Sequence, residues 1–196
     1  MDGSAALSAA EELRWVTRAK EGDQAAFEAI FQRYERPIYQ FIYRMTGNVE
    51  DASDLTQECF IRAYRSLSQT SDDLNVSAWL HRIAANACLD ALRRRQRIRW
   101  LPWEGHGQPN HELGRCLEDP EREALRSETQ EVVQRVLNQM NPRYRLALIL
   151  REFEGLSCDE IGQIMRLSRS AVKSVLFRAR EEFRRIYRMT EETAPP

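Results

Sequence analysis

The chain has 196 residues, 42% of them apolar, so it is long enough for one medium-sized domain or two small ones and too apolar to be disordered throughout. A formal net charge of −1 gives no sign of a surface that binds polyanions everywhere, so any nucleic-acid site must come from local charge asymmetry. The charges are sorted by segment. Residues 77–99 carry six arginines and one acid, residues 169–188 carry seven basic and two acidic side chains, and residues 104–123 carry six acids and two arginines.

The N-terminal residues show no basic start followed by an apolar run, and no apolar stretch reaches the roughly 18 residues that a membrane span needs. We therefore expect a soluble, cytoplasmic protein without membrane insertion. Residues 9–21 predict a short first helix, which Gly22 breaks.

Asp23 is expected to cap a long helix that runs to Gly47. Its apolar side chains recur every three or four residues from Ala26 to Tyr34 and continue beyond Pro37, a candidate site for a kink. The aromatic side chains fit a protein core better than a surface on which bases stack. A helix this apolar needs a partner.

That partner is predicted from Val49 to Leu67, with Asn48 as its N-cap. Its apolar positions turn inward, and its outward face combines two acids, an amide and an isoleucine, namely Asp54, Gln57, Glu58 and Ile61. An exposed isoleucine in such a setting suits protein docking. From these residues alone, an ordinary solvated face is the better interpretation.

A polar loop from Ser68 to Asn75 precedes a helix predicted from Ser77 to Arg99. One side of this helix is apolar, with Leu80, Ile83, Ala84, Ala87 and Ala91. The other side is polar and is followed by further arginines: Arg82, Asn86, Asp90, Arg93, Arg94, Arg95, Arg97 and Arg99. A row of amide, carboxylate and guanidinium groups indicates nucleic acid, although a solvated face that ends in a basic run is equally compatible with the pattern.

From Trp100 to about Pro120 the helical pattern stops, and prolines, glycines and acids predict an acidic flexible linker between two domains. Three residues in it, His106, His111 and Cys116, have metal-like spacing but lack a fourth ligand, so no metal and no other cofactor is predicted. The four cysteines of the chain include no CxxC pair, which favours free thiols in a reducing cytoplasm.

The second domain begins near Glu121 with an amphipathic helix, followed by a mostly buried one that starts at Asn141 and Pro142 and ends at Gly155. The residues 157–160, Ser-Cys-Asp-Glu, form a capping box that opens a short helix.

Ser168 then caps a last helix that runs to about Arg188. Two helices joined by three or four residues make a helix-turn-helix. The face of the last helix opposite its apolar side carries Ser170, Lys173, Ser174, Phe177 and Arg178. These groups suit the major groove, where basic groups meet phosphates and guanine edges and an aromatic ring contacts a thymine methyl. A protein-interaction module with Phe177 in an interface is the alternative; the spacing, caps and charge together favour DNA.

Three motifs, DLTQECF at 54–60, WLHRIAANACLDALRRR at 79–95, and LREFEGLSCDEIGQIM with LSRSAVKSVLFRAR up to 180, resemble bacterial sigma factors of the extracytoplasmic-function (ECF) group. These are compact members of the sigma-70 family that retain regions two and four. The resemblance implies an all-α protein of two small helical domains, with region two at 1–99, a linker at 100–120 and region four at 121–196, including a short disordered C-terminal tail. It implies no catalysis.

The resemblance also implies roles for the faces. Asp54, Gln57, Glu58 and Ile61 would dock on the clamp helices of the RNA polymerase β′ subunit. The helix and the loop before it would bind the −10 promoter element and separate its strands. Arg82, Asn86, Asp90 and Arg93 would face this DNA, and Arg94, Arg95, Arg97 and Arg99 would add charge for phosphates. Ser170, Lys173, Ser174, Phe177 and Arg178 would read the −35 element in a domain that also touches the β flap. The linker would thread a basic channel of polymerase, and an anti-sigma factor would be a further partner.

Three departures from the family pattern bear on these roles. The loop Ser68 to Asn75 lacks the aromatic-basic-glycine run often found there, which leaves the preferred −10 base open. Arg166 stands where a glycine often closes the turn, so either Arg166 takes a positive φ or the turn differs. Val175 replaces a frequent arginine, which removes one phosphate contact.

Two other functions compete with this interpretation. In a free-standing helix-turn-helix regulator, neither the outward face from Asp54 to Ile61 nor the basic helix at 77–99 would have a function, and this argues against that alternative. An enzyme acting on nucleic acid would need paired carboxylates, a phosphate-binding glycine loop or an activated nucleophile, and the sequence shows none of these.

Overall fold

The computed structural model describes residues 2–71, 74–98 and 120–192, and the side chains of 2–10, 96–98, 120–128 and 192 are not among those described. Within these residues the chain forms eight α-helices and one short 3-10 helix, and no strand. The prediction of an all-α fold with two helical domains is confirmed.

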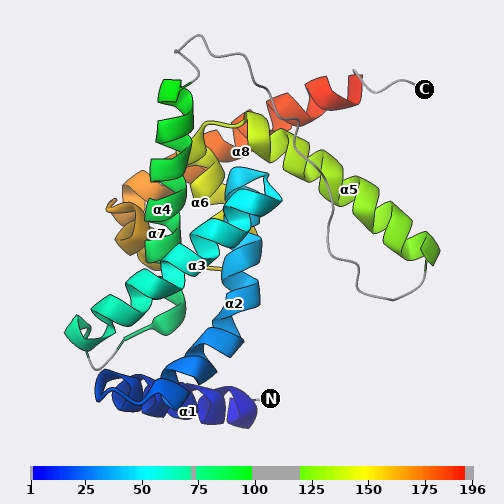
Figure 1. Cartoon of the computed structure of the whole chain (residues 1–196). Coiled ribbons are helices and arrows are strands. Elements are labelled where there is room, and N and C mark those ends of the chain that lie inside the picture. Colours follow the sequence, from blue (N-terminus) through cyan, green and yellow to red (C-terminus); the bar gives the residue numbers. More distant parts are fainter. Residues whose placement is uncertain (1, 72–73, 99–119, 193–196) are drawn as a thin grey trace.

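The first domain contains α1 (Asp2–Lys20), α2 (Gln24–Thr46), α3 (Val49–Ser66), the 3-10 helix η1 (Leu67–Gln69) and α4 (Val76–Ile98). Helix α1 lies at the base of the molecule and packs against α2, while α3 crosses α2 and α4 packs against both (Figure 1). The predicted start of α1 was wrong. The helix was expected to begin at residue 9, and it begins seven residues earlier, at Asp2. The predicted loop was also too long, because η1 takes up its first residues.

Local caps explain where α2 and α3 begin and end. The Asp23 carboxylate accepts hydrogen bonds from the backbone N–H groups of Ala25 and Ala26 at 2.9 and 3.2 Å, which lowers the pKa of Asp23. Gly47 ends α2 in the left-handed conformation with φ 67°, and Asn48 caps α3 through Asp51 N–H at 2.7 Å. Helix α2 runs without interruption through Pro37.

The second domain contains α5 (Pro120–Gln139), α6 (Pro142–Glu152), α7 (Cys158–Met165) and α8 (Arg169–Glu192). The predicted linker lies outside the described residues except for Pro120, which belongs to α5. Helix α8 is longer than predicted, since no glycine or proline stops it at Arg188. The capping box is present: the Ser157 hydroxyl accepts from Glu160 N–H at 3.2 Å, and Glu160 accepts from Ser157 N–H at 2.8 Å.

The two domains pack against each other. Helix α7 contacts α4, and α6 contacts both α2 and α4 (Figure 1). Their buried apolar side chains form one cluster that extends from Ile30 and Phe41 in α2 to Ile149 in α6 and Leu176 in α8. The sequence had indicated two domains but not this contact between them.

Candidate nucleic-acid and protein interfaces

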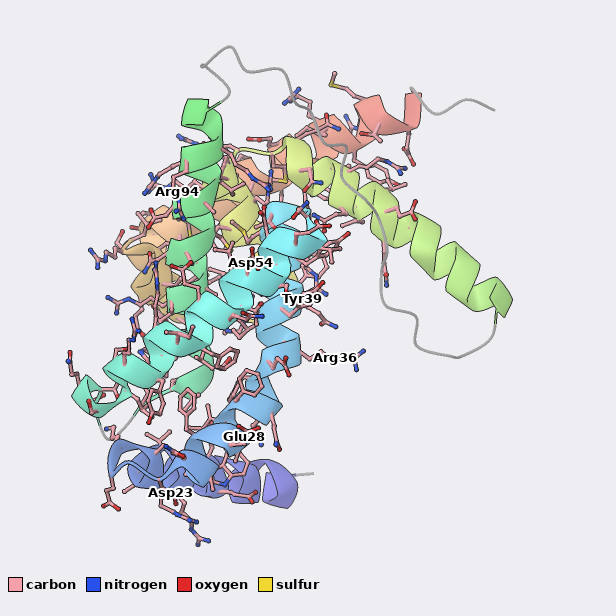
Figure 2. All side chains as sticks on the ribbon, in the orientation of Figure 1. Asp23, Glu28, Arg36, Tyr39, Asp54 and Arg94 are labelled. Atoms are coloured by element: carbon pink, nitrogen blue, oxygen red, sulfur yellow. The ribbon has the colours of Figure 1, made fainter. Side chains whose placement is uncertain are left out.

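The first candidate surface is the α3 face, defined as Asp54, Gln57, Glu58 and Ile61. Its opposite side is packed into the core, where Cys59 and Ala63 are fully buried. Asp54 lies on the outer side of α3 (Figure 2), and Ile61 is 51% exposed. The structure thus brings the four predicted residues together on one exposed helix face.

Tyr64 extends the α3 face, and the sequence analysis missed it. Its ring is 51% exposed and meets the ring of Phe27 edge-on, with 5.0 Å between centroids. Because Tyr64 follows Ile61 by three residues, the two side chains are neighbours on the helix. The separation of three residues between Ile61 and Tyr64 is the sequence feature from which Tyr64 could have been assigned to this face. Beside them, Arg62 pairs with Glu58 at 2.5 Å.

The second candidate surface is the α4 face, defined as Arg82, Asn86, Asp90, Arg93, Arg94 and Arg95. All six side chains are exposed, and Arg94 projects away from the molecule (Figure 2). The predicted apolar side packs inward, with Leu80, Ala84 and Ala87 buried. The side chain of Arg97 and the whole of Arg99 lie outside the described residues.

Two arginines of the α4 face are held by acids. Arg93 pairs with Asp90 at 3.3 Å, and Arg95 pairs with Asp51 at the start of α3. Both pairs lie near the surface, where an ion pair contributes little, so exchanging the carboxylate for a phosphate is inexpensive. The Arg95–Asp51 pair connects α4 to the first turn of α3.

The loop before α4 is anchored at both ends. The Lys20 ammonium at the end of α1 donates to the carbonyl oxygens of Thr70 and Ser71 at 2.7 and 2.8 Å. At the other end, Asn75 caps α4, accepting from Ala78 N–H at 2.9 Å. The predicted loop residues 72 and 73 lie outside the described residues.

The third candidate surface is the α8 face, defined as Ser170, Lys173, Ser174, Phe177 and Arg178. All five side chains are exposed, and the Phe177 ring is 66% exposed. On the opposite side Val172, Leu176 and Ala179 are buried. Arg180 pairs with Glu152 of α6 at 2.8 Å at the protein surface.

The turn between α7 and α8 is a short one that is closed by a residue in the left-handed conformation. Arg166 adopts the left-handed conformation with φ 54°, and the Leu167 N–H donates to the Gly162 carbonyl at 2.9 Å. A Cβ atom on Gly162 would lie 2.7 Å from the Leu167 carbonyl oxygen, so only glycine allows this approach. Arg166 therefore takes the positive φ that the sequence analysis left open.

The cysteines of the described residues are free thiols. Burial raises the pKa of Cys59 to about 12 and raises that of Cys88 as well. Within the described parts of the chain no three metal-ligating side chains come together, and no helix is long and apolar enough to cross a membrane. His106, His111 and Cys116 lie outside those parts.

Known proteins of similar sequence were found for both helical domains. The Sigma-70 region 2 family matches residues 30–98, and the Sigma-70, region 4 family matches residues 130–183. The ECF RNA polymerase sigma factor SigW of Bacillus subtilis is 33% identical over 174 residues, which cover 87% of this chain and 93% of SigW. The RNA polymerase sigma-H factor of Pseudomonas aeruginosa is 34% identical over 183 residues, which cover 89% of this chain and 93% of that factor.

Solved structures share the fold. CnrH, solved in complex with the cytosolic domain of CnrY, has a TM-score of 0.68 and 22% identity over 94% of this chain and 99% of that chain. RpoE of Bartonella quintana, solved with the anti-sigma factor NepR, has a TM-score of 0.65 and 20% identity over 83% of this chain and 96% of that chain. The resemblance found in the sequence is confirmed. The chain belongs to the ECF group of the bacterial sigma-70 family, whose members are not catalysts but initiation factors that direct transcription with core RNA polymerase.

Proposed function

We propose that this chain binds core RNA polymerase, recognises the −35 and −10 elements of its promoters and separates the strands at the −10 element. The observation that carries the proposal is the exposure of three faces, each on a helix whose other side is packed in the core. Each face is already exposed in the free chain.

The α3 face is the proposed polymerase contact. Ile61 and Tyr64 supply exposed apolar area toward the C-terminal end of the face, and Asp54, Gln57 and Glu58 place acid and amide groups on the turns before them. Exposed apolar anchors beside polar groups suit a protein interface. The partner would be the clamp helices of β′, with region four touching the β flap.

The α4 face is the proposed −10 contact. Unstacking a base costs a few kcal/mol, which phosphate contacts and stacking must offset. Arg82 and Arg94 supply exposed positive charge at two levels of α4, and Asn86, one turn after Arg82, offers an exposed amide that can hydrogen-bond an unpaired base. The loop anchored by Lys20 and Asn75 lies at the start of the same helix.

The α8 face is the proposed −35 contact. Lys173, Phe177 and Arg178 lie near the N-terminal half of a helix of 24 residues, the part that enters the major groove in helix-turn-helix proteins. Val175 is half-buried against the core and offers no charge. The phosphate contacts of this helix then rest on Lys173 and Arg178.

An anti-sigma factor is a proposed further partner. The support is that solved structures of the same fold hold such a protein, as in the complex of RpoE with NepR. Such a partner has exposed apolar side chains to cover here, including Ile61 and Phe177.

Reconstitution tests the proposal. The purified chain is mixed with core polymerase that lacks a sigma factor, and binding is followed by comigration and initiation by run-off transcription. The proposal requires comigration, loss of comigration in Ile61→Asp, and little change in Arg135→Ala, a variant at an exposed α5 position outside the three faces. Failure of the native chain to bind core would contradict it and would favour a free-standing regulator.

A further inference from the structure

The segment that follows α3 is tied to α1. The Lys20 ammonium, at the last residue of α1, donates to the carbonyl oxygens of Thr70 and Ser71 at 2.7 and 2.8 Å. Because the donor is charged, these hydrogen bonds are stronger than bonds between neutral groups. Residues 67–71, which comprise η1, Thr70 and Ser71, are termed the η1 segment.

Helix α1 is itself fixed on the first domain. Val16 and Ala19 are buried in the core, and α1 packs along α2 and beside η1 (Figure 1). The Glu12 carboxylate accepts a hydrogen bond from the Tyr34 hydroxyl of α2. Burial and this carboxylate raise the pKa of Tyr34, so the hydroxyl keeps the proton that it donates. Lys20 therefore extends from a support that is packed independently of the η1 segment.

The η1 segment offers its carbonyl groups to Lys20. Leu67 is buried, and its carbonyl oxygen accepts from the N–H and from the hydroxyl of Thr70 at 3.1 and 2.7 Å. Both donors of Thr70 are thus satisfied within the segment, while its carbonyl oxygen accepts from Lys20. Asn75 caps α4 by accepting from a backbone N–H of the first turn at 2.9 Å. The chain therefore has fixed positions at Ser71 and at Asn75.

Lys20 lies outside the residues that the Sigma-70 region 2 family matches, which begin at residue 30 in α2. The match therefore assigns Lys20 no role. In the function proposed above, the −10 element is bound by α4 and the segment before it. Polar groups distinguish bases by hydrogen bonds, and such groups must be held within about 0.5 Å of the productive geometry. A contact that fixes two carbonyl groups of this segment thus bears on which base is accepted.

We propose that Lys20 is a positioning residue for −10 recognition: it holds the η1 segment against α1, and this position determines the base preference at the −10 element. The role in base preference rests on the proposed function, whereas the anchoring of the η1 segment does not. The Lys20 ammonium is directed at carbonyl oxygens of the chain, so it acts on DNA through the η1 segment. Its loss therefore changes the relative use of −10 sequences and does not lower all of them equally.

Three substitutions in the full-length chain test this role. Lys20→Met keeps the apolar stem and removes the donors, whereas Lys20→Arg keeps a charged donor. Arg14→Met is the matched control, because it removes one positive charge from an exposed position of the same helix. Thermal unfolding followed by circular dichroism checks that every variant remains folded.

Amide hydrogen exchange, measured by NMR on the free chain, tests the anchor. The N–H of Thr70 should exchange about 3- to 10-fold faster in Lys20→Met, the factor expected from the net contribution of one hydrogen bond. Lys20→Arg and Arg14→Met should keep the native exchange rate. A native exchange rate in Lys20→Met would overturn the anchor.

Transcription by the reconstituted holoenzyme tests the role in recognition. The templates carry one fixed −35 element and randomised −10 bases, and sequencing of the transcripts gives the ratio between the favoured −10 sequence and its single-base variants. This ratio should fall about 3- to 10-fold in Lys20→Met and stay near the native value in Lys20→Arg and Arg14→Met. The apparent Kd for core polymerase should be the same for every variant, because Lys20 lies outside the α3 face.

An unchanged ratio in Lys20→Met, despite faster exchange at Thr70, would overturn the role in base preference. An equal loss for every −10 sequence, with a weaker salt dependence of DNA binding, would also overturn it, because that result is typical of a direct phosphate contact. If the native chain supports no initiation with core polymerase, the proposed function fails and the −10 role fails with it. The exchange at Thr70 still decides whether Lys20 anchors the η1 segment.

Discussion

Phe177→Ala removes the apolar group at the centre of the α8 face. The ring is 66% exposed, so about 130 Å² of a side chain of roughly 200 Å² is available to a partner. At about 25 cal/mol per Å², complete burial against DNA would contribute about 3 kcal/mol, and contact with one thymine methyl buries about half of it. We expect a loss of about 1.5 kcal/mol, or about tenfold in affinity for the −35 element.

The assay compares run-off transcription by the reconstituted holoenzyme from two promoters, one with a −35 element selected from a randomised library and one with that element scrambled. Phe177→Ala should reduce transcription from the first to near the level of the second. Its unfolding free energy should change by less than about 0.5 kcal/mol, since the ring is exposed. Met189→Ala, at a position 56% exposed on the same helix, is the control and should retain the −35 dependence. A loss of core binding or of stability as large as the loss of −35 use would refute the assignment.

Three further substitutions probe the α4 face and the turn. Asn86→Ala should impair strand opening, measured by permanganate reactivity, more than duplex binding measured by mobility shift, because the amide is proposed to hold an unpaired base; equal losses would remove Asn86 from melting. Gly162→Ala should destabilise the chain by about 1–2 kcal/mol in urea unfolding, because the new methyl lies 2.7 Å from a carbonyl oxygen; glycine to alanine in an unobstructed helix stabilises by about 0.5–1 kcal/mol instead, so the sign of the change decides. Arg166→Gly should stabilise the turn by about 0.5–1 kcal/mol, since a left-handed residue with a Cβ costs about 1–2 kcal/mol and part of this is returned as unfolded-state entropy; a lower Tm would contradict this.

Features set by neighbouring residues could be predicted from the sequence. Asp23, Asn48 and the Ser157–Glu160 box begin their helices as predicted, because a cap acts within three residues. The exposed faces of α3, α4 and α8 follow from helical spacing and the positions of apolar residues. Helix α1 was predicted too short, because its first residues are small and lack the apolar period that marks a helix.

The contact between the domains could not be predicted in this way. His81 and Glu154 are 73 positions apart, and Arg145 meets a carbonyl 100 positions before it. Arg145 directly precedes the apolar run of residues 146–150 in α6, a signal that a buried charge must find partners. The residues near Arg145 in the sequence do not identify its partners, because those depend on how the two domains pack.

In the function we propose, this chain opens promoter DNA together with core polymerase. The direct test is permanganate reactivity of thymines across the −10 element of a promoter selected from a library of randomised elements, with the chain alone, core alone and both. We predict reactivity only when both are present, and its loss with Ile61→Asp. Equal reactivity with the chain alone, or none with both although they comigrate, would contradict the claim.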